Sequence, residues 1–153
     1  MTWEQLFWEP PFWEPLFSAA NTLALAAWLG LLVLPRWPAL LQAIRLGVVS
    51  LLAAGYSALV LVYFFRVEGG GFGSLAAVKI LLSSNPVLLA GWVHYLAFDL
   101  FVGVWLAERL DAQRVARPLQ ALVLITTFMF GPLGYLLASA PSLVTATRNL
   151  ANA

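Results

Sequence analysis

The chain has 153 residues, of which 62% are hydrophobic and 10% are charged, and its mean hydropathy is +0.88. Soluble domains carry about 25% charged residues, so this composition excludes a water-soluble globular domain, a disordered segment and a coiled coil. A small integral membrane protein remains. The eight Lys and Arg are scattered, which argues against a nucleic-acid partner, and the absence of Cys excludes disulfides and thiolate metal sites.

Apolar stretches of membrane-spanning length occur four times. A helix needs about 20 apolar residues to cross the ~30 Å hydrocarbon core of a bilayer. We therefore predict an all-α membrane protein, a four-transmembrane-helix bundle, with residues 1–153 forming a single membrane domain. The spans are expected at about residues 16–35, 46–65, 86–107 and 119–138.

The Lys and Arg count of the connections predicts the orientation, because these residues favour the cytoplasmic side. With the N-terminus outside, the cytoplasmic side collects five basic residues and the outer side three. Four spans would then place both termini outside. The acidic start of the chain, with Glu4, Glu9 and Glu14, argues against a cleaved signal peptide.

Two segments outside the spans are expected to lie at the membrane interface. The pattern W-E-x-x-F occurs three times in residues 3–17, and it predicts an interfacial N-terminal anchor or a lid over a lateral entrance. After the glycine-rich joint at 69–73, Ser74 can cap a short interfacial helix that runs to about Ser83 and precedes the third span. That helix is either a simple connection or a mobile flap over a site.

Two ionisable residues lie near the middle of the third span. An Asp at the centre of a membrane helix costs on the order of 2.5–3.5 kcal/mol, so Asp99 and His94 are candidates for function as well as for structural contacts between helices. Five positions at 100° each put them about 140° apart, on different faces. Tyr95, four positions before Asp99, can reach its carboxyl group.

Polar groups of other spans are expected at the same depth. In the fourth span, Pro132 displaces the Phe128 carbonyl, Thr126 and Thr127 lie beside it, and residues 131–134 should kink the helix. Tyr56 and Ser57 lie at the middle of the second span. We predict one cavity between the third and fourth spans, closed by the second, although structural contacts between helices could explain the same pattern.

Small residues recur every four positions in the second span, from Ser50 to Ala54 and Ala58. Such stripes let helices approach closely, either within the bundle or between copies in a homo-oligomer. No metal site is expected, because one His and one buried Asp cannot build a di-iron centre. We expect no cofactor, so any chemistry would be proton transfer unless a lipid-like cofactor is bound.

The sequence Trp92-Val93-His94-Tyr95-Leu96-Ala97-Phe98-Asp99-Leu100-Phe101, with Phe128-Met129-Phe130-Gly131-Pro132-Leu133-Gly134 further on, resembles a known family. It is similar to the neoxanthin synthase-like, or abscisic-acid-deficient-four-like, family of small integral membrane proteins. Plant members carry a chloroplast transit peptide, whereas this acidic, Arg-free start does not read as one. The resemblance therefore implies a bacterial relative in the cytoplasmic (inner) membrane.

The resemblance implies carotenoid metabolism, with conversion of the epoxide violaxanthin to the allene neoxanthin as the plant reaction. Such a cofactor-free isomerase needs an acid and a base, and the matching positions suggest Asp99 as the acid and His94 as the base. The substrate-binding candidates are Trp92, Tyr95, Phe98, Tyr56, Thr127 and Phe128. The alternative is a non-catalytic membrane protein that binds a carotenoid, quinone or lipid, or that stabilises an enzyme complex.

Overall fold

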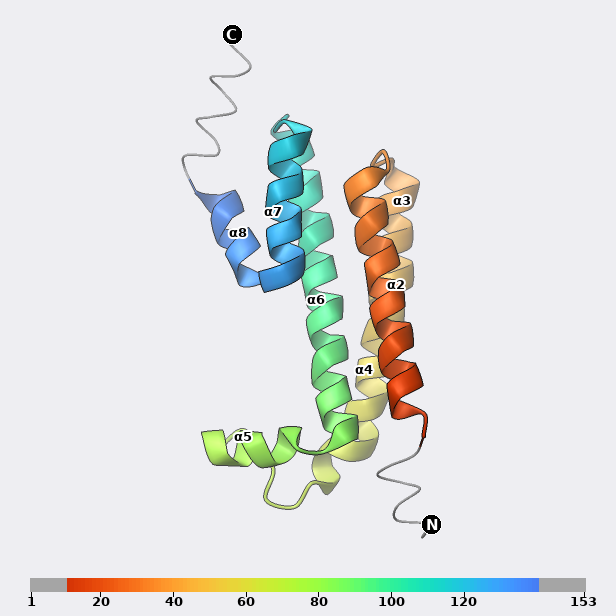
Figure 1. Cartoon of the computed structure of the whole chain (residues 1–153), viewed down its shortest axis with the longest axis vertical. Helices are drawn as coiled ribbons and strands as arrows, with labels where there is room; N and C mark the ends of the chain where they lie inside the picture. The colour runs from red at the N-terminus through yellow and green to blue at the C-terminus, as the bar shows by residue number, and fades with distance from the viewer. Residues whose placement is uncertain (1–10, 141–153) are drawn as a thin grey trace.

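The computed structural model describes residues 11–140, and this part of the chain is helical, without a strand (Figure 1). The α-helices are α2 (Trp13–Val33), α3 (Pro38–Gln42), α4 (Ser50–Tyr63), α5 (Leu75–Leu82), α6 (Asn85–Ala112), α7 (Arg117–Phe130) and α8 (Pro132–Ser139). A π-helical stretch over Ala43–Val49 joins α3 to α4, and a 3-10 turn at Phe64–Arg66 follows α4.

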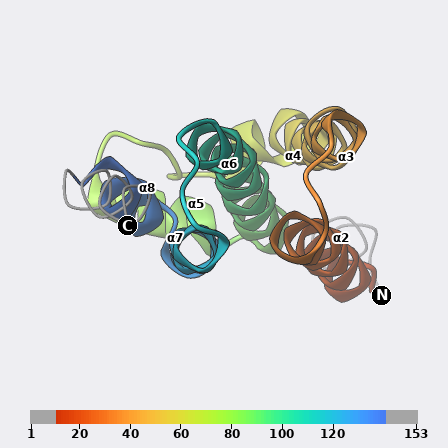
Figure 2. The same cartoon turned by 90° about the horizontal axis from the view of Figure 1, so that it is seen from above.

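Three helical segments are long and apolar enough to cross a membrane: Trp13–Val33, Pro38–Arg66 and Asn85–Ala112. They run alongside one another in Figures 1 and 2 and overlap the first three expected spans. The second segment begins eight residues earlier than expected, because Pro38 is tolerated in a first turn and the helix continues through the π-helical stretch. Arg45 therefore lies within this segment, where it forms an ion pair with Glu108 of α6.

The expected fourth span is not one kinked helix. α7 has 14 residues, or roughly 21 Å of helix, which is too short to cross the ~30 Å core. It ends at Gly131, whose φ of 46° and ψ of −97° turn the chain sharply, and Pro132 then starts α8. Figure 1 shows α8 returning beside α7, so the two helices form a hairpin with Gly131 at its tip.

A glycine on α8 lets this hairpin close. A Cβ atom at Gly134 would lie 2.0 Å from Thr127 Oγ1 and 2.6 Å from Thr127 Cα. No side chain fits there, because α8 rests directly on the backbone of α7. Sequence reasoning foresaw that residues 131–134 disturb the helix, but the close contact between α7 and α8 makes the disturbance a reversal rather than a kink.

The hairpin changes the expected placement of the chain ends. Four crossings would return the chain to the side of its N-terminus, whereas three crossings and a hairpin send α8 back toward the end at which α7 begins (Figure 1). The prediction that both termini lie on one side is therefore not supported by the part of the chain that the structure describes. The end where α7 begins carries Arg36, Arg45, Arg109, Arg114 and Arg117, and the other end carries Arg66 and Lys79.

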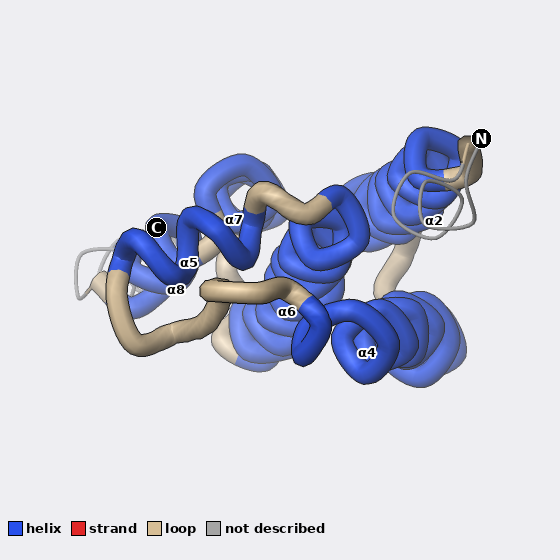
Figure 3. Tube along the Cα trace, turned by 90° about the horizontal axis from the view of Figure 1, so that it is seen from below, coloured by secondary structure: helices blue, strands red, loops and turns tan. Residues whose placement is uncertain are grey.

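The predicted short helix is present as α5. The Ser74 hydroxyl caps it by accepting a hydrogen bond of 3.1 Å from the Ala77 amide. Figures 1 and 3 show α5 lying across the end of the helix bundle, beneath the level of the hairpin. The third W-E-x-x-F repeat starts α2, with Pro15 in its first turn, whereas the first repeat and residues 8–10 of the second lie outside the described residues.

The core between α2 and α6 is packed around one indole ring. Trp28 is almost fully buried, and a Cβ atom at Gly103 would lie 2.3 Å from Trp28 Cη2. Leu31, Leu100 and Val104 surround this contact. Because Gly103 has no side chain, α6 approaches α2 closely, and α6 thereby becomes the central helix, which contacts α2, α4, α5, α7 and α8.

Candidate functional site

The two ionisable residues in the middle of α6 face different neighbours. Asp99 lies at the tip of the α7–α8 hairpin, and a Cβ atom at Gly131 would be 2.7 Å from its Oδ1 atom. His94 instead packs its ring against Tyr56 of α4, with the ring centroids 5.0 Å apart. The structure therefore does not bring the predicted acid and the predicted base together.

We use the name Asp99 cluster for Tyr95, Asp99, Met129 and Gly131. The Asp99 Oδ2 atom is buried and has no hydrogen-bond partner among the described residues. The Tyr95 hydroxyl interacts with the Asp99 carboxyl and donates a long hydrogen bond of 3.4 Å to the Met129 carbonyl. A buried polar atom without a partner is costly, so its presence marks a place where a ligand group can bind.

The tip of the hairpin adds backbone polarity to this cluster. A helix leaves its last carbonyls and its first amides without partners inside the helix, and here the end of α7 meets the start of α8. The Gly131 amide donates a hydrogen bond of 2.7 Å to the Thr127 carbonyl, and the Gly134 amide donates one of 3.0 Å to the Gly131 carbonyl. Broken helices at membrane depth are a recurrent way to build a polar ligand site.

The His94 cluster, formed by Tyr56, His94 and Phe98, is aromatic. The His94 ring lies 4.6 Å from the Phe98 ring, centroid to centroid, and both side chains are exposed on the surface of the described chain. The Ser57 hydroxyl donates a hydrogen bond to the Ala53 carbonyl of its own helix, and Ser57 is not part of this cluster. His94 is therefore placed to contact lipid or a bound apolar molecule rather than Asp99.

Two of the predicted substrate-binding residues instead pack the interior. Thr127 is fully buried under α8, and its hydroxyl donates to the Val123 carbonyl at 2.8 Å. The Phe128 ring packs against Trp28, with centroids 5.5 Å apart. By contrast, the Trp92 and Tyr95 rings lie 5.5 Å apart on the side of α6 that carries Asp99.

A pocket lies on the same helix as Asp99 but toward the start of α6, and not where the sequence placed it. Its volume is about 450 Å³, and it opens between the start of α2 and the start of α6. Trp92 is part of its wall, so the pocket adjoins the Asp99 cluster through the Trp92–Tyr95 contact. No residue of the expected second span lines this pocket, so it is not the cavity predicted between the third and fourth spans.

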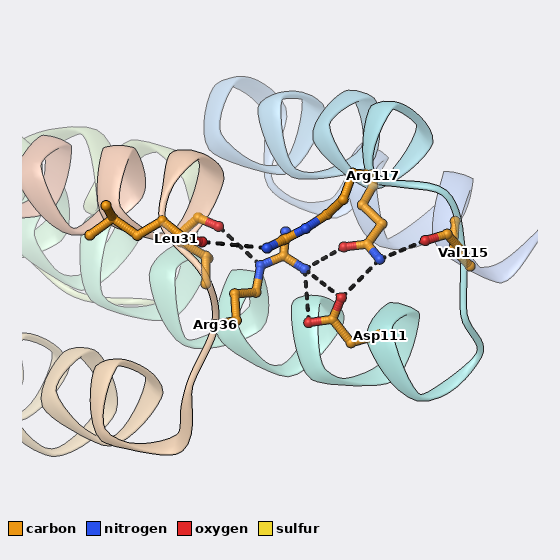
Figure 4. A network of polar contacts seen from close by, with 7 residues as sticks. Leu31, Arg36, Asp111, Val115 and Arg117 are labelled. Carbon is orange, nitrogen blue, oxygen red and sulfur yellow. Dashed lines mark hydrogen bonds and ion pairs between the residues drawn. The ribbon is translucent and has the colours of Figure 1, made fainter.

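A polar network that the sequence analysis did not find joins the other ends of α2, α6 and α7 (Figure 4). Arg36 donates to the Leu31 carbonyl at 3.0 Å and to both oxygens of Asp111 at 3.1 Å. The Gln120 side chain accepts from Arg36 and donates to Asp111 at 2.9 Å and to the Val115 carbonyl at 2.8 Å. Gln120 is the one side-chain amide in an apolar helix. This residue is the signal in the sequence that could have revealed the network.

Burial lowers the pKa of Arg36 from its ordinary value, and the hydrogen bond and charge of Asp111 oppose that shift. The Arg36 side chain is only 3% exposed, so its charge depends on these partners. Both carboxylate oxygens of Asp111 and both ends of the Gln120 amide are used. We interpret this Arg36 network as a structural contact between helices, because Asp111 and Gln120 direct their polar side-chain atoms to Arg36 and to each other.

The described residues contain no group of three or more His, Cys, Asp or Glu side chains that could hold a metal ion.

One family of known proteins matches this chain. Residues 15–137, which include α6 and most of the hairpin, match the ABA4-like family, described as ABA DEFICIENT 4-like. Comparisons with curated proteins and with solved structures gave no match.

Proposed function

The chain belongs to the ABA DEFICIENT 4-like family, a carotenoid-related family, and we propose that it is a membrane-embedded carotenoid isomerase that uses Asp99 for proton transfer. One observation carries the proposal: partly buried Asp99 lies at the tip of a broken helix, and its Oδ2 atom is buried without a hydrogen-bond partner among the described residues. We also propose that the N-terminus lies outside, because the basic residues gather at the opposite end. The membrane would be a bacterial cytoplasmic membrane.

The proposed reaction converts an epoxide end group into an alcohol with an adjacent allene. A neutral carboxyl group donates its proton to the epoxide oxygen, and the carbon–oxygen bond breaks with its electron pair moving to oxygen. The carboxylate then removes a proton from a neighbouring carbon, whose C–H electrons form the new double bond. The acid is restored, and substrate and product have the same composition.

Asp99 is suited to both steps. A hydrocarbon environment favours the neutral carboxyl, because an unpaired charge is expensive to bury. Once the proton has left, the neighbouring Tyr95 hydroxyl can donate a hydrogen bond to the carboxylate. One carboxyl that serves as acid and then as base removes the need for His94, which the structure places beside Tyr56.

The test is conversion of an epoxide carotenoid by purified protein in lipid vesicles, with products separated by chromatography. We expect Asp99→Asn to lower turnover by about 10²- to 10⁴-fold, the usual loss when a general acid–base group is removed. His94→Gln is the matched control on the same helix and should stay within about threefold of the wild-type rate. Bound but unchanged carotenoid in the wild-type protein would replace the isomerase with a carotenoid-binding protein.

A further inference from the structure

We propose that the pocket between the starts of α2 and α6 is a second part of the ligand site, which holds the far, hydroxylated end of an elongated isoprenoid. The placement of the reacting end rests on the proposed function, whereas binding in the pocket can be measured without turnover. The pocket has a volume of about 450 Å³. Six of the residues that line it are Trp13, Glu14, Phe17, Leu88, Leu89 and Trp92.

The chemistry of the pocket points to an apolar molecule with a polar end. Aromatic and aliphatic side chains form most of its wall, as in sites that bury small apolar ligands. Glu14 contributes a carboxylate, which can accept a hydrogen bond from a hydroxyl group. The same negative charge disfavours an anionic headgroup, so the wall favours an uncharged, hydroxylated ligand over an anionic lipid.

A row of neighbouring aromatic rings connects this pocket to Asp99. The Phe17 and Trp92 rings lie 5.7 Å apart, and the Trp92 and Tyr95 rings lie 5.5 Å apart. Tyr95 in turn interacts with Asp99. Flat polyene chains pack well against such rings, so a ligand can run along α6 from Asp99 into the pocket.

The hairpin leaves this part of α6 accessible. Its tip reaches α6 at Asp99 and turns back, as Figure 1 shows, so α7 and α8 do not extend to the start of α6. From Asp99 to Asn85, which also lines the pocket, is 14 residues or roughly 21 Å along the helix. The ligand must therefore carry its two functional ends about that far apart, which excludes short terpenoids.

Equilibrium binding of a dihydroxy carotenoid to protein in vesicles tests the proposal. Trp92→Leu should weaken binding about tenfold, in line with the loss of a central aromatic contact. Trp105→Leu is the matched control, because both indoles are on α6 and are 40% and 42% exposed, but Trp105 lies outside the pocket wall. Binding to this control should stay within about twofold of wild type.

Trp92 also donates a hydrogen bond of 3.1 Å to Asn21, so a second variant fills the pocket without removing a contact. Leu88→Trp should block binding about as strongly as Trp92→Leu, whereas Leu25→Trp, on the exposed side of α2, should not. Glu14→Gln should weaken the dihydroxy ligand about threefold or more and leave the parent hydrocarbon unaffected.

The outcomes separate this proposal from the isomerase. If Asp99→Asn abolishes turnover while the pocket variants bind normally, the pocket proposal is overturned and the isomerase stands. If the wild-type protein never converts its ligand but the pocket variants lose binding, the isomerase fails and the pocket stands. A photoreactive group at residue 88 that captures phospholipid in preference to carotenoid would also overturn the pocket proposal.

Discussion

Two carboxylates of helix α6 lie near the α7–α8 region, and they differ in their hydrogen bonding. Asp111, at the basic end, accepts hydrogen bonds with both oxygens from Arg36 and Gln120. Asp99, twelve residues earlier, has a buried oxygen with no partner among the described residues. The Asp111 carboxylate stabilises the contact between the helices, whereas the Asp99 carboxyl at the hairpin tip keeps an oxygen that can bind a ligand group.

This contrast separates structural from functional polarity. A satisfied network holds helices in register, and removing one member leaves a buried charge uncompensated. An unsatisfied carboxyl contributes little to folding and can even oppose it, so the fold gains nothing by keeping it. Changes at the two sites should therefore move stability and activity in different directions.

The largest loss of stability is expected at the Arg36 network. Asp111→Ala leaves the buried Arg36 guanidinium without its counter-charge and should lower the free energy of unfolding by about 2–3 kcal/mol, below the usual range for a fully buried pair because Asp111 is 39% exposed. Thermal unfolding in detergent measures the change. Glu108→Ala is the control, since its partner Arg45 is 37% exposed where Arg36 is 3% exposed, and the loss should be no more than ~1 kcal/mol. Equal melting temperatures for the two variants would contradict the structural role of the network.

An intermediate loss is expected at the hairpin. Gly134→Ala places a methyl group against the Thr127 backbone, so α8 must move away from α7, at about 1–3 kcal/mol of overpacking. Gly55→Ala, where nothing lies within 4 Å, should instead be neutral or stabilising by up to ~1 kcal/mol. Because α8 holds the tip beside Asp99, Gly134→Ala should also reduce turnover. A variant as stable and active as wild type would show that the hairpin is not closely packed.

Much of the architecture follows from local signals in the sequence. Apolar length located the first three spans, and Ser74 marked the start of α5. Helical periodicity also separated Asp99 from His94, as the structure shows. These features depend on residues close together in the chain, which is why a single sequence reveals them.

The hairpin and the Arg36 network depend on contacts between distant residues. A Gly-Pro pair in an apolar run predicts a disturbed helix, but only the contact of Gly134 with Thr127 decides that the chain turns back. Likewise, Arg36 and Asp111 are 75 positions apart, so their pairing cannot be deduced from spacing. The pocket between α2 and α6 depends on distant contacts in the same way, so spacing does not locate it. In the sequence, Trp13 and Phe17 read as part of an interfacial anchor or lid, and Trp92 as a substrate-binding candidate.

We infer that Asp99 serves chemistry and not folding, and stability and turnover measured on the same Asp99→Asn samples decide the point. We expect a melting temperature equal to or above that of wild type, because a carboxyl with one buried, unpartnered oxygen is replaced, together with loss of carotenoid conversion. A variant that melts well below wild type, as Asp111→Ala should, or that converts carotenoid at the wild-type rate, would contradict it.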